Sequence, residues 1–156
     1  MKRRKFLIAL GVVPPLVLEA CKGDQLPKIA TVVKASVVDD KGVPIENIPL
    51  KFQGYQNYGG NFGTGGGGKL DTTFKIEKNS DKQGNVEFSQ IVPEITTDVY
   101  FSMGDTFIYS YFKIKAKKNN IIINNDDGPA IAGYPSSSKE LILGETNEYE
   151  IILTKK

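Results

Sequence analysis

The side chains that could carry chemistry in this 156-residue chain are limited by which residue types are missing. The sequence contains no histidine and no tryptophan, and its single cysteine is Cys21. Without imidazole, the usual general base at neutral pH and the commonest metal ligand are absent. Catalysis would have to use carboxylates, lysine, tyrosine or hydroxyl groups. We therefore expect a protein that is not an enzyme and that needs neither a cofactor nor a metal.

The glycine-rich stretch 54–69 contains a partial match to a phosphate-binding loop. Gly63–Lys69 has the spacing of a glycine, four residues and then Gly-Lys. The next position must be Ser or Thr to hold magnesium, and here it is Leu70. The residues after Leu70 also alternate as a strand does, whereas a phosphate-binding loop needs a helix there. We expect no bound nucleotide.

The first half of the same stretch offers aromatic side chains for binding. Tyr55, Tyr58 and Phe62 are separated by Gly, Asn and Gln. Rings combined with adaptable amides can stack on a sugar or dock a protein partner. The alternative is a mobile hairpin loop whose rings pack on the edge of the sandwich.

Two acidic clusters are better explained as turns than as metal sites. Asn124–Gly128 supplies oxygen atoms but lacks the alternate spacing and the distal Glu of a calcium loop. Asp39 and Asp40 precede Gly42, and Asp before Gly is common turn chemistry.

The beginning of the chain has the pattern of an export signal. Residues 2–5 are all basic, and residues 6–18 are mostly apolar. This apolar stretch is shorter than the roughly 20 residues of a membrane-spanning helix and fits a cleavable signal peptide. Arg3–Leu7 resembles the twin-arginine export signal, and the alternative is an ordinary basic leader.

Leu18-Glu19-Ala20-Cys21 resembles the lipobox of bacterial lipoproteins. The resemblance implies cleavage between Ala20 and Cys21 and attachment of fatty-acyl chains, such as palmitate, at Cys21. Glu19 departs from the small or aliphatic residue usual there, and the alternative is a secretory leader with an incidental cysteine. Lys22 after the cysteine favours the outer membrane of the bacterial cell envelope as the destination.

This arrangement predicts a signal peptide (1–20), a tether (21–28) and one domain (29–156). The formal charge of +2 includes four basic residues and one acidic residue of the leader, so a chain beginning at Cys21 carries about −1. A near-neutral domain argues against a nucleic-acid partner.

The domain is predicted to be all-β. Ile29 to Val38 alternates with a period of two, as does Thr72 to Glu77, and turn residues separate such segments. We expect further strands at Phe107 to Ala116 and Leu141 to Leu143, and a long loop over Asn124 to Ser138. Seven or eight short strands indicate an antiparallel β-sandwich.

Two segments resemble transthyretin-like and carboxypeptidase regulatory-like domains, which are Ig-like sandwiches. In the first, Val37–Ile45, a strand ends in Asp and a glycine turn precedes Pro. In the second, Ser80–Phe88, a Ser-Asp-x-x-Gly turn leads into a strand. The resemblance implies a non-catalytic accessory or docking module.

The sequence thus predicts a membrane-anchored, non-catalytic envelope lipoprotein that binds a protein or glycan partner or has a structural role. The alternative is an exported enzyme that uses a metal or carboxylate and tyrosine side chains, related to sandwich-fold dioxygenases. Those enzymes hold iron through tyrosines and histidines, and this chain has no histidine.

Overall fold

The structure is a computed structural model that describes residues 26–58, 69–105, 108–124, 130–134 and 141–156. The predicted signal peptide with Ala20, the lipidation site Cys21, and Phe62 lie outside these residues. Among the described residues no helix is long and apolar enough to cross a membrane. The division of the chain into signal peptide, tether and domain stays a prediction.

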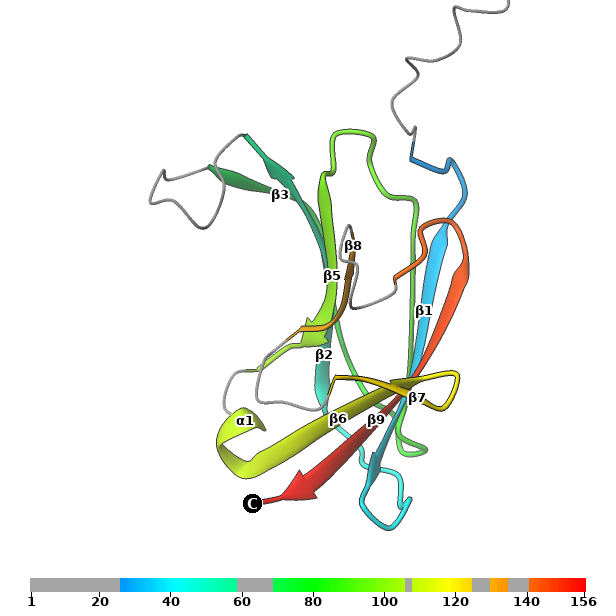
Figure 1. The fold of residues 1–156 in the computed structure, drawn as a ribbon, viewed down its shortest axis with the longest axis vertical. Coiled ribbons are helices and arrows are strands. Elements are labelled where there is room, and N and C mark those ends of the chain that lie inside the picture. Colours follow the sequence, from blue (N-terminus) through cyan, green and yellow to red (C-terminus); the bar gives the residue numbers. More distant parts are fainter. Residues whose placement is uncertain (1–25, 59–68, 106–107, 125–129, 135–140) are drawn as a thin grey trace, which may run out of the picture.

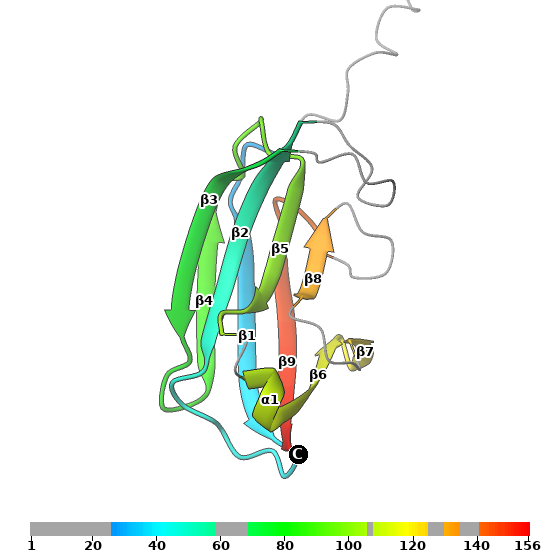
Figure 2. The ribbon, with the colours of Figure 1, turned by 90° about the vertical axis from the view of Figure 1, so that its left-hand side faces the viewer.

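Two sheets packed face to face make up the described part of the chain (Figures 1 and 2). The five-stranded sheet has the order β4-β1-β9-β6-β7, and the four-stranded sheet has the order β3-β2-β5-β8. The strands are β1 (Thr31–Asp39), β2 (Pro49–Asn57), β3 (Leu70–Asn79), β4 (Asn85–Gln90), β5 (Asp98–Met103), β6 (Phe112–Lys118), β7 (Ile121–Asn124), β8 (Ala130–Tyr134) and β9 (Thr146–Lys155). Neighbouring strands are antiparallel except β1 and β9, which are parallel. The predicted β-sandwich is confirmed.

Alternation along the strands fills the space between the sheets with apolar side chains. Phe52 on β2, Phe88 on β4 and Phe101 on β5 are fully buried. The rings of Phe88 and Phe101 lie 5.9 Å apart, and Tyr149 of β9 lies 5.3 Å from Phe101. Ring pairs of this kind add stabilisation beyond the burial of their area. The core is therefore continuous from one sheet to the other.

The number and position of the strands differ from the sequence prediction at three places. The strand expected from Phe107 begins only at β6, because Ile108–Tyr111 forms one helical turn, α1, that buries Ile108. The segment Leu141 to Leu143 is not a strand, although Leu141 is buried. The expected loop contains β8, which pairs with β5. Nine strands are described where seven or eight were expected, because tertiary packing outweighs local pattern in such short segments.

Two turns of the same design close one end of the sandwich. Oδ1 of Asp39 accepts hydrogen bonds of 2.8 Å from the amides of Lys41 and Val43. Oδ1 of Asp81 accepts bonds of 2.9 and 2.8 Å from the amides two and four residues later. In each turn the fourth residue is a glycine with positive φ. The turn prediction for Asp39 is confirmed.

Candidate functional site

The outer face of the four-stranded sheet carries a hollow of about 400 Å³ over β2 and β5. Figure 1 shows this sheet from its edge, with the upper part of β3 bending away from the sandwich. We call the hollow the tyrosine groove. Its central side chains are those of Lys51, Gln53, Tyr55, Asp98, Tyr100 and Ser102.

The pairing of β2 with β5 arranges these side chains in rows across the sheet. Gln53 lies directly opposite Tyr100, and Tyr55 lies directly opposite Asp98. Side chains that are opposite or diagonal on one face of an antiparallel pair come within reach of one another. Each aromatic ring in the groove therefore has a polar side chain directly across from it.

The two tyrosines stand next to each other on the diagonal. Their ring centroids are 6.1 Å apart, with an angle of 59° between the ring planes. Both side chains are partly exposed. Gly133 of β8 lies opposite Tyr100 on its other side, and a Cβ added there would lie 3.2 Å from Cδ1 of Tyr100. The missing side chain at Gly133 thus leaves room for the ring of Tyr100.

Electrostatics keep the Tyr100 hydroxyl protonated. Burial raises the pKa of Tyr100, and the negative charge of Asp98 and the neighbouring Tyr55 raise it further. The Asp98 carboxylate is itself oriented, because the hydroxyl of Thr97 donates a 2.7 Å hydrogen bond to its Oδ2. Around neutral pH the groove therefore presents a phenol that can donate or accept and a carboxylate that can only accept.

Paired charges line the side of the groove nearest β3. Nζ of Lys51 lies 3.2 Å from Oε1 of Glu77, and Nζ of Lys75 lies 2.9 Å from the same oxygen. Hydrogen bonds from Lys75 and then Lys51 lower the pKa of Glu77. Two ammonium groups on one carboxylate leave this side cationic by one charge, while Asp98 is anionic. The groove has no dominant charge.

One polar atom in the groove lacks a partner. Oδ1 of Asn57 is buried and makes no hydrogen bond within the part of the chain that the structure describes. Asn57 lines the groove at the end of β2, next to Leu70. A buried amide oxygen without a donor is costly, but this atom is closed off from solvent, so a ligand in the groove does not reach it without a rearrangement.

The structure separates the aromatic residues that the sequence placed together. Tyr55 lies in the groove, whereas the hydroxyl of Tyr58 donates a 2.7 Å bond to Oε1 of Gln56, and Lys69 lies 5.9 Å from the centre of the Tyr58 ring. Gln56 and Tyr58 alternate with Tyr55 and Asn57, so they occupy the opposite face of the strand. A partner contact through Tyr58 and Phe62 stays a prediction.

Sequence reasoning missed Tyr100, Gln53 and Asp98. One signal was present, because Tyr100 stands between the core residues Val99 and Phe101 and must therefore point outward. The partner strand and its register were not readable from the sequence. Without the partner strand and its register, the sequence does not predict that Tyr100 lies beside Tyr55.

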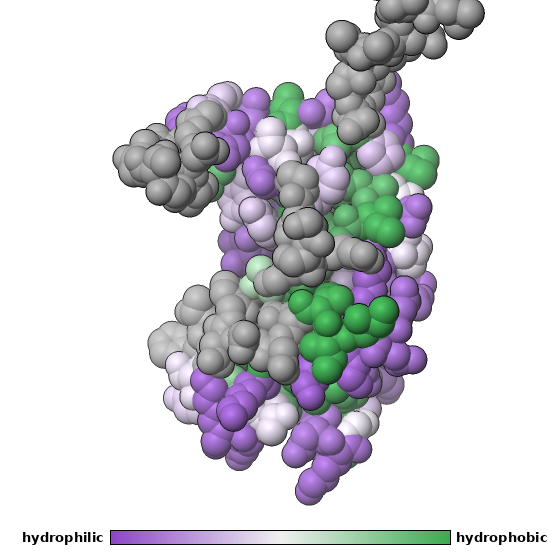
Figure 3. Space-filling view, in the orientation of Figure 1, coloured by the Kyte–Doolittle hydropathy of each residue, from purple (hydrophilic) through white to green (hydrophobic). Residues whose placement is uncertain are grey.

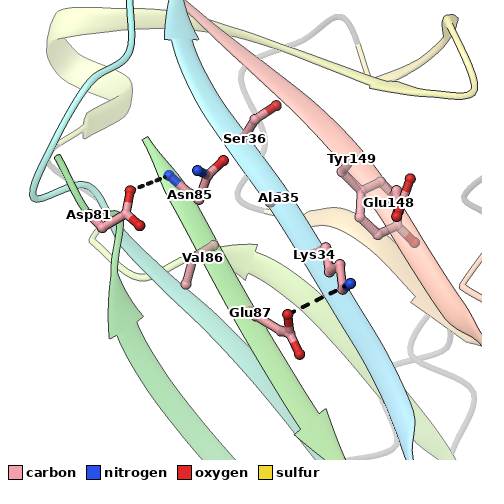
Figure 4. Close-up of a pocket in the computed structure, with 9 residues that line it drawn as sticks. All are labelled: Lys34, Ala35, Ser36, Asp81, Asn85, Val86, Glu87, Glu148 and Tyr149. Atoms are coloured by element: carbon pink, nitrogen blue, oxygen red, sulfur yellow. Dashed lines mark hydrogen bonds and ion pairs between the residues drawn. The ribbon is translucent and has the colours of Figure 1, made fainter. Parts of the chain in front are cut away.

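A second hollow, of about 500 Å³, lies on the outer face of the five-stranded sheet (Figure 4). Lys34 lies opposite Glu87 on one side and Glu148 on the other in the strand register, and its Nζ lies 3.8 Å from Oε2 of Glu87. Asp81 is used by its own turn. Such complementary charges are typical of a solvated sheet face. The tyrosine groove is therefore the better candidate site.

The described residues limit the chemistry of the groove. Between residues 26 and 156, outside the gaps, no three His, Cys, Asp or Glu side chains are grouped so that they could hold a metal ion. Leu70 begins β3 and not a helix, so the glycine-rich stretch lacks the helix that phosphate binding requires. The groove supplies ring faces, an amide, a carboxylate and hydroxyl groups, which suit reversible binding.

Comparison with known proteins adds no family to this picture. No protein-family profile matches the sequence. No curated protein matches it either.

The solved structures that match the chain differ widely in what they are. The chain is 13% identical to 3-chlorocatechol 1,2-dioxygenase of Rhodococcus opacus, with a TM-score of 0.42, and the match covers 86% of this chain and 63% of the dioxygenase. The C-terminal domain of the shaft pilin SpaA of Lactobacillus rhamnosus is 11% identical, with a TM-score of 0.37, over 83% of this chain and 100% of that domain. A 9R-lipoxygenase of Cyanothece is 14% identical, with a TM-score of 0.36, over 83% of this chain and 18% of the enzyme. At these scores the likeness carries no argument about function.

Proposed function

We propose that this chain is a lipid-anchored, non-catalytic binding module of the bacterial cell envelope, and that it holds saccharides in the tyrosine groove. The single observation that carries the choice of ligand is the pair Tyr55 and Tyr100, each with a polar side chain directly opposite. The anchor rests on Leu18–Cys21 in the sequence.

A saccharide fits the groove because it combines apolar ring faces with hydroxyl groups. The tilted rings of Tyr55 and Tyr100 offer two apolar faces. Gln53 and Asp98 offer hydrogen-bonding groups that hydroxyls can satisfy. Binding sites commonly join an apolar surface to a few such groups in a hollow of this size.

A protein partner fits the same surface less well. Energetically important protein contacts bury large side chains in desolvated pockets from which water is excluded. Here Gln53 and Asp98 stand across from the rings, and a protein side chain would have to satisfy or desolvate them. A ligand rich in hydroxyl groups can pack against the rings and at the same time form hydrogen bonds with Gln53 and Asp98.

Saccharide binding can be tested with the full-length protein on immobilised polysaccharides and oligosaccharide arrays. Tyr55→Ala and Tyr100→Ala should each weaken binding about tenfold or more, the equivalent of about 1.4 kcal/mol. The matched control is Tyr111→Ala, since Tyr111 is 64% exposed on α1 and does not line the groove. Undiminished binding by the Tyr55→Ala and Tyr100→Ala variants would contradict the proposal.

Two further measurements address the anchor and the absence of catalysis. Cys21→Ser should move the protein from the membrane fraction to the soluble fraction, and membrane retention of that variant would contradict the anchor. Stoichiometric metal in natively exported protein, or chemical turnover of a bound saccharide, would favour the alternative of an exported enzyme.

A further inference from the structure

One end of the sandwich carries exposed isoleucines where the chain enters the domain. Ile29, Ile91 and Ile95 are 62%, 56% and 59% exposed. We call this end the isoleucine end. Thr31 pairs with Gln90, so Ile29 and Ile91 flank the same end of the β1–β4 pair. Nζ of Lys28 lies 3.7 Å from Oε1 of Glu94, which brings Ile29 and Ile95 to the same region.

The three isoleucines lie on segments that the structure holds in place. Gly144 has no side chain, and a Cβ there would lie 3.0 Å from Cγ1 of Ile29 and 2.7 Å from Pro27. The segment that carries Ile95 is tied down by the amide of Thr97, which donates a 2.8 Å bond to the carbonyl oxygen of Tyr55. Exposed apolar side chains that share one end of a domain and are held in position are candidates for a contact site.

The opposite end of the sandwich differs in character. It carries the loop after β1 and the turn before β4, which include Asp40, Lys41, Glu46 and Lys82. Figure 3 shows mainly hydrophilic residues at the lower end, and hydrophobic residues mixed with hydrophilic ones near the point where the described chain begins. Val43 is the exposed apolar residue of the opposite loop, with 55% of its surface accessible.

We infer that the isoleucine end rests on the surface of the lipid bilayer that holds the chain, with the isoleucine side chains in the interfacial region. The inference rests on the proposed anchor at Cys21. Ile29 follows Cys21 by eight residues, which span at most about 29 Å when fully extended. The tether therefore keeps this end, and not the opposite one, close to the membrane, where a high effective concentration favours even a weak apolar contact.

Charge at this end fits a neutral lipid surface. Within the described residues of the isoleucine end, Lys28 pairs with Glu94, so this pair offers no net positive charge to anionic headgroups. The contact is apolar and should form on zwitterionic lipid. With the isoleucine end on the bilayer, the tyrosine groove opens sideways along the membrane, because it lies on the flank of the sandwich (Figure 1).

Tryptophan fluorescence tests the contact cleanly, since the chain has no tryptophan of its own. Ile95→Trp and Ile29→Trp place single reporters at the isoleucine end, and Val43→Trp is the matched control at the opposite end. Full-length lipidated protein is reconstituted into phosphatidylcholine vesicles, with and without acyl-brominated phosphatidylcholine. We expect at least a twofold loss of emission with brominated lipid, and a blue shift, for Ile95→Trp and Ile29→Trp, and no change for Val43→Trp.

The outcomes separate this inference from the anchor. If the protein floats with the vesicles but both reporters at the isoleucine end behave like Val43→Trp, the contact is overturned and the anchor stands. If the protein does not float, the anchor fails and the contact with it. Quenching that appears only after addition of anionic phosphatidylglycerol would also overturn an apolar contact.

Discussion

The backbone amide of Val37 donates a 2.8 Å hydrogen bond to the carbonyl oxygen of Gly84, and a Cβ on Gly84 would overlap the carbonyl oxygen of Val37. The bond joins the end of β1 to the turn before β4. It therefore connects the two segments that resemble transthyretin-like domains in the sequence. Glycine at position 84 is required both by its positive φ of 76° and by this close approach.

Gly84→Ala should destabilise the protein more than Gly42→Ala does. Both glycines have positive φ, but a Cβ on Gly42 would meet nothing within 4 Å. Each variant should lose about 1 kcal/mol of stability through backbone strain, because alanine disfavours positive φ. The overlap with the carbonyl oxygen of Val37 should cost Gly84→Ala about 1–3 kcal/mol more. Urea unfolding of the two variants measures the difference. Equal losses of stability would show that the contact with Val37 relaxes without cost.

Asn147→Ala should cost about 2–4 kcal/mol, because it leaves several buried groups without partners. Asn147 is fully buried. Its Oδ1 accepts hydrogen bonds from the backbone amide of Ile142 and from Nζ of Lys118. Its Nδ2 donates hydrogen bonds to the carbonyl oxygens of Ile142 and Glu145. The control is Asn85→Ala on the exposed side of β4, expected to change stability by less than about 0.5 kcal/mol. Chemical denaturation would compare them, and a similar small effect for both would argue against a structural network.

The raised pKa of Tyr100 predicts that the folded protein loses stability at alkaline pH. Burial raises the pKa of Tyr100, and the unfolded chain has a tyrosine pKa near 10. The folded state therefore favours protonated Tyr100. The contribution of this protonated side chain to the free energy of unfolding is complete below about pH 10, and it is lost as the pH rises through the pKa of Tyr100 in the folded state. Above pH 10 the free energy of unfolding should fall more steeply for the wild type than for Tyr100→Phe. Urea titrations at several alkaline pH values measure this, and parallel curves would refute it.

Gly133→Val should weaken saccharide binding more than it weakens the fold. The added side chain would enter the space beside Tyr100, since even a Cβ at Gly133 would lie 3.2 Å from the Tyr100 ring. The ring of Tyr100 would then be pushed toward Tyr55 on its other side and out of its present arrangement with that ring. Saccharide affinity and thermal unfolding, measured on the same sample, give both effects. A large loss of stability with unchanged affinity would place Gly133 in the fold and not in the groove.

The alternation of apolar residues was enough to predict the sandwich and much of its core. Val33 and Val37 on β1, and Val86 and Phe88 on β4, are buried as the period of two requires. The turn at Asp39 followed from residue type, because its hydrogen bonds run to neighbours within four positions. Local interactions of this kind are readable from a sequence because both partners lie in the same short segment.

Tertiary structure alone decided the groove and the shortest elements. Tyr55 and Tyr100 stand far apart in the chain and meet only because β2 and β5 pair in one register, which no local pattern specifies. The strand β8 exists through its pairing with β5, and the turn α1 through the burial of Ile108. By itself the sequence determined the alternating strands and the turns, whose causes are local. The binding surface was decided by pairings between distant segments, because those depend on how the whole chain packs.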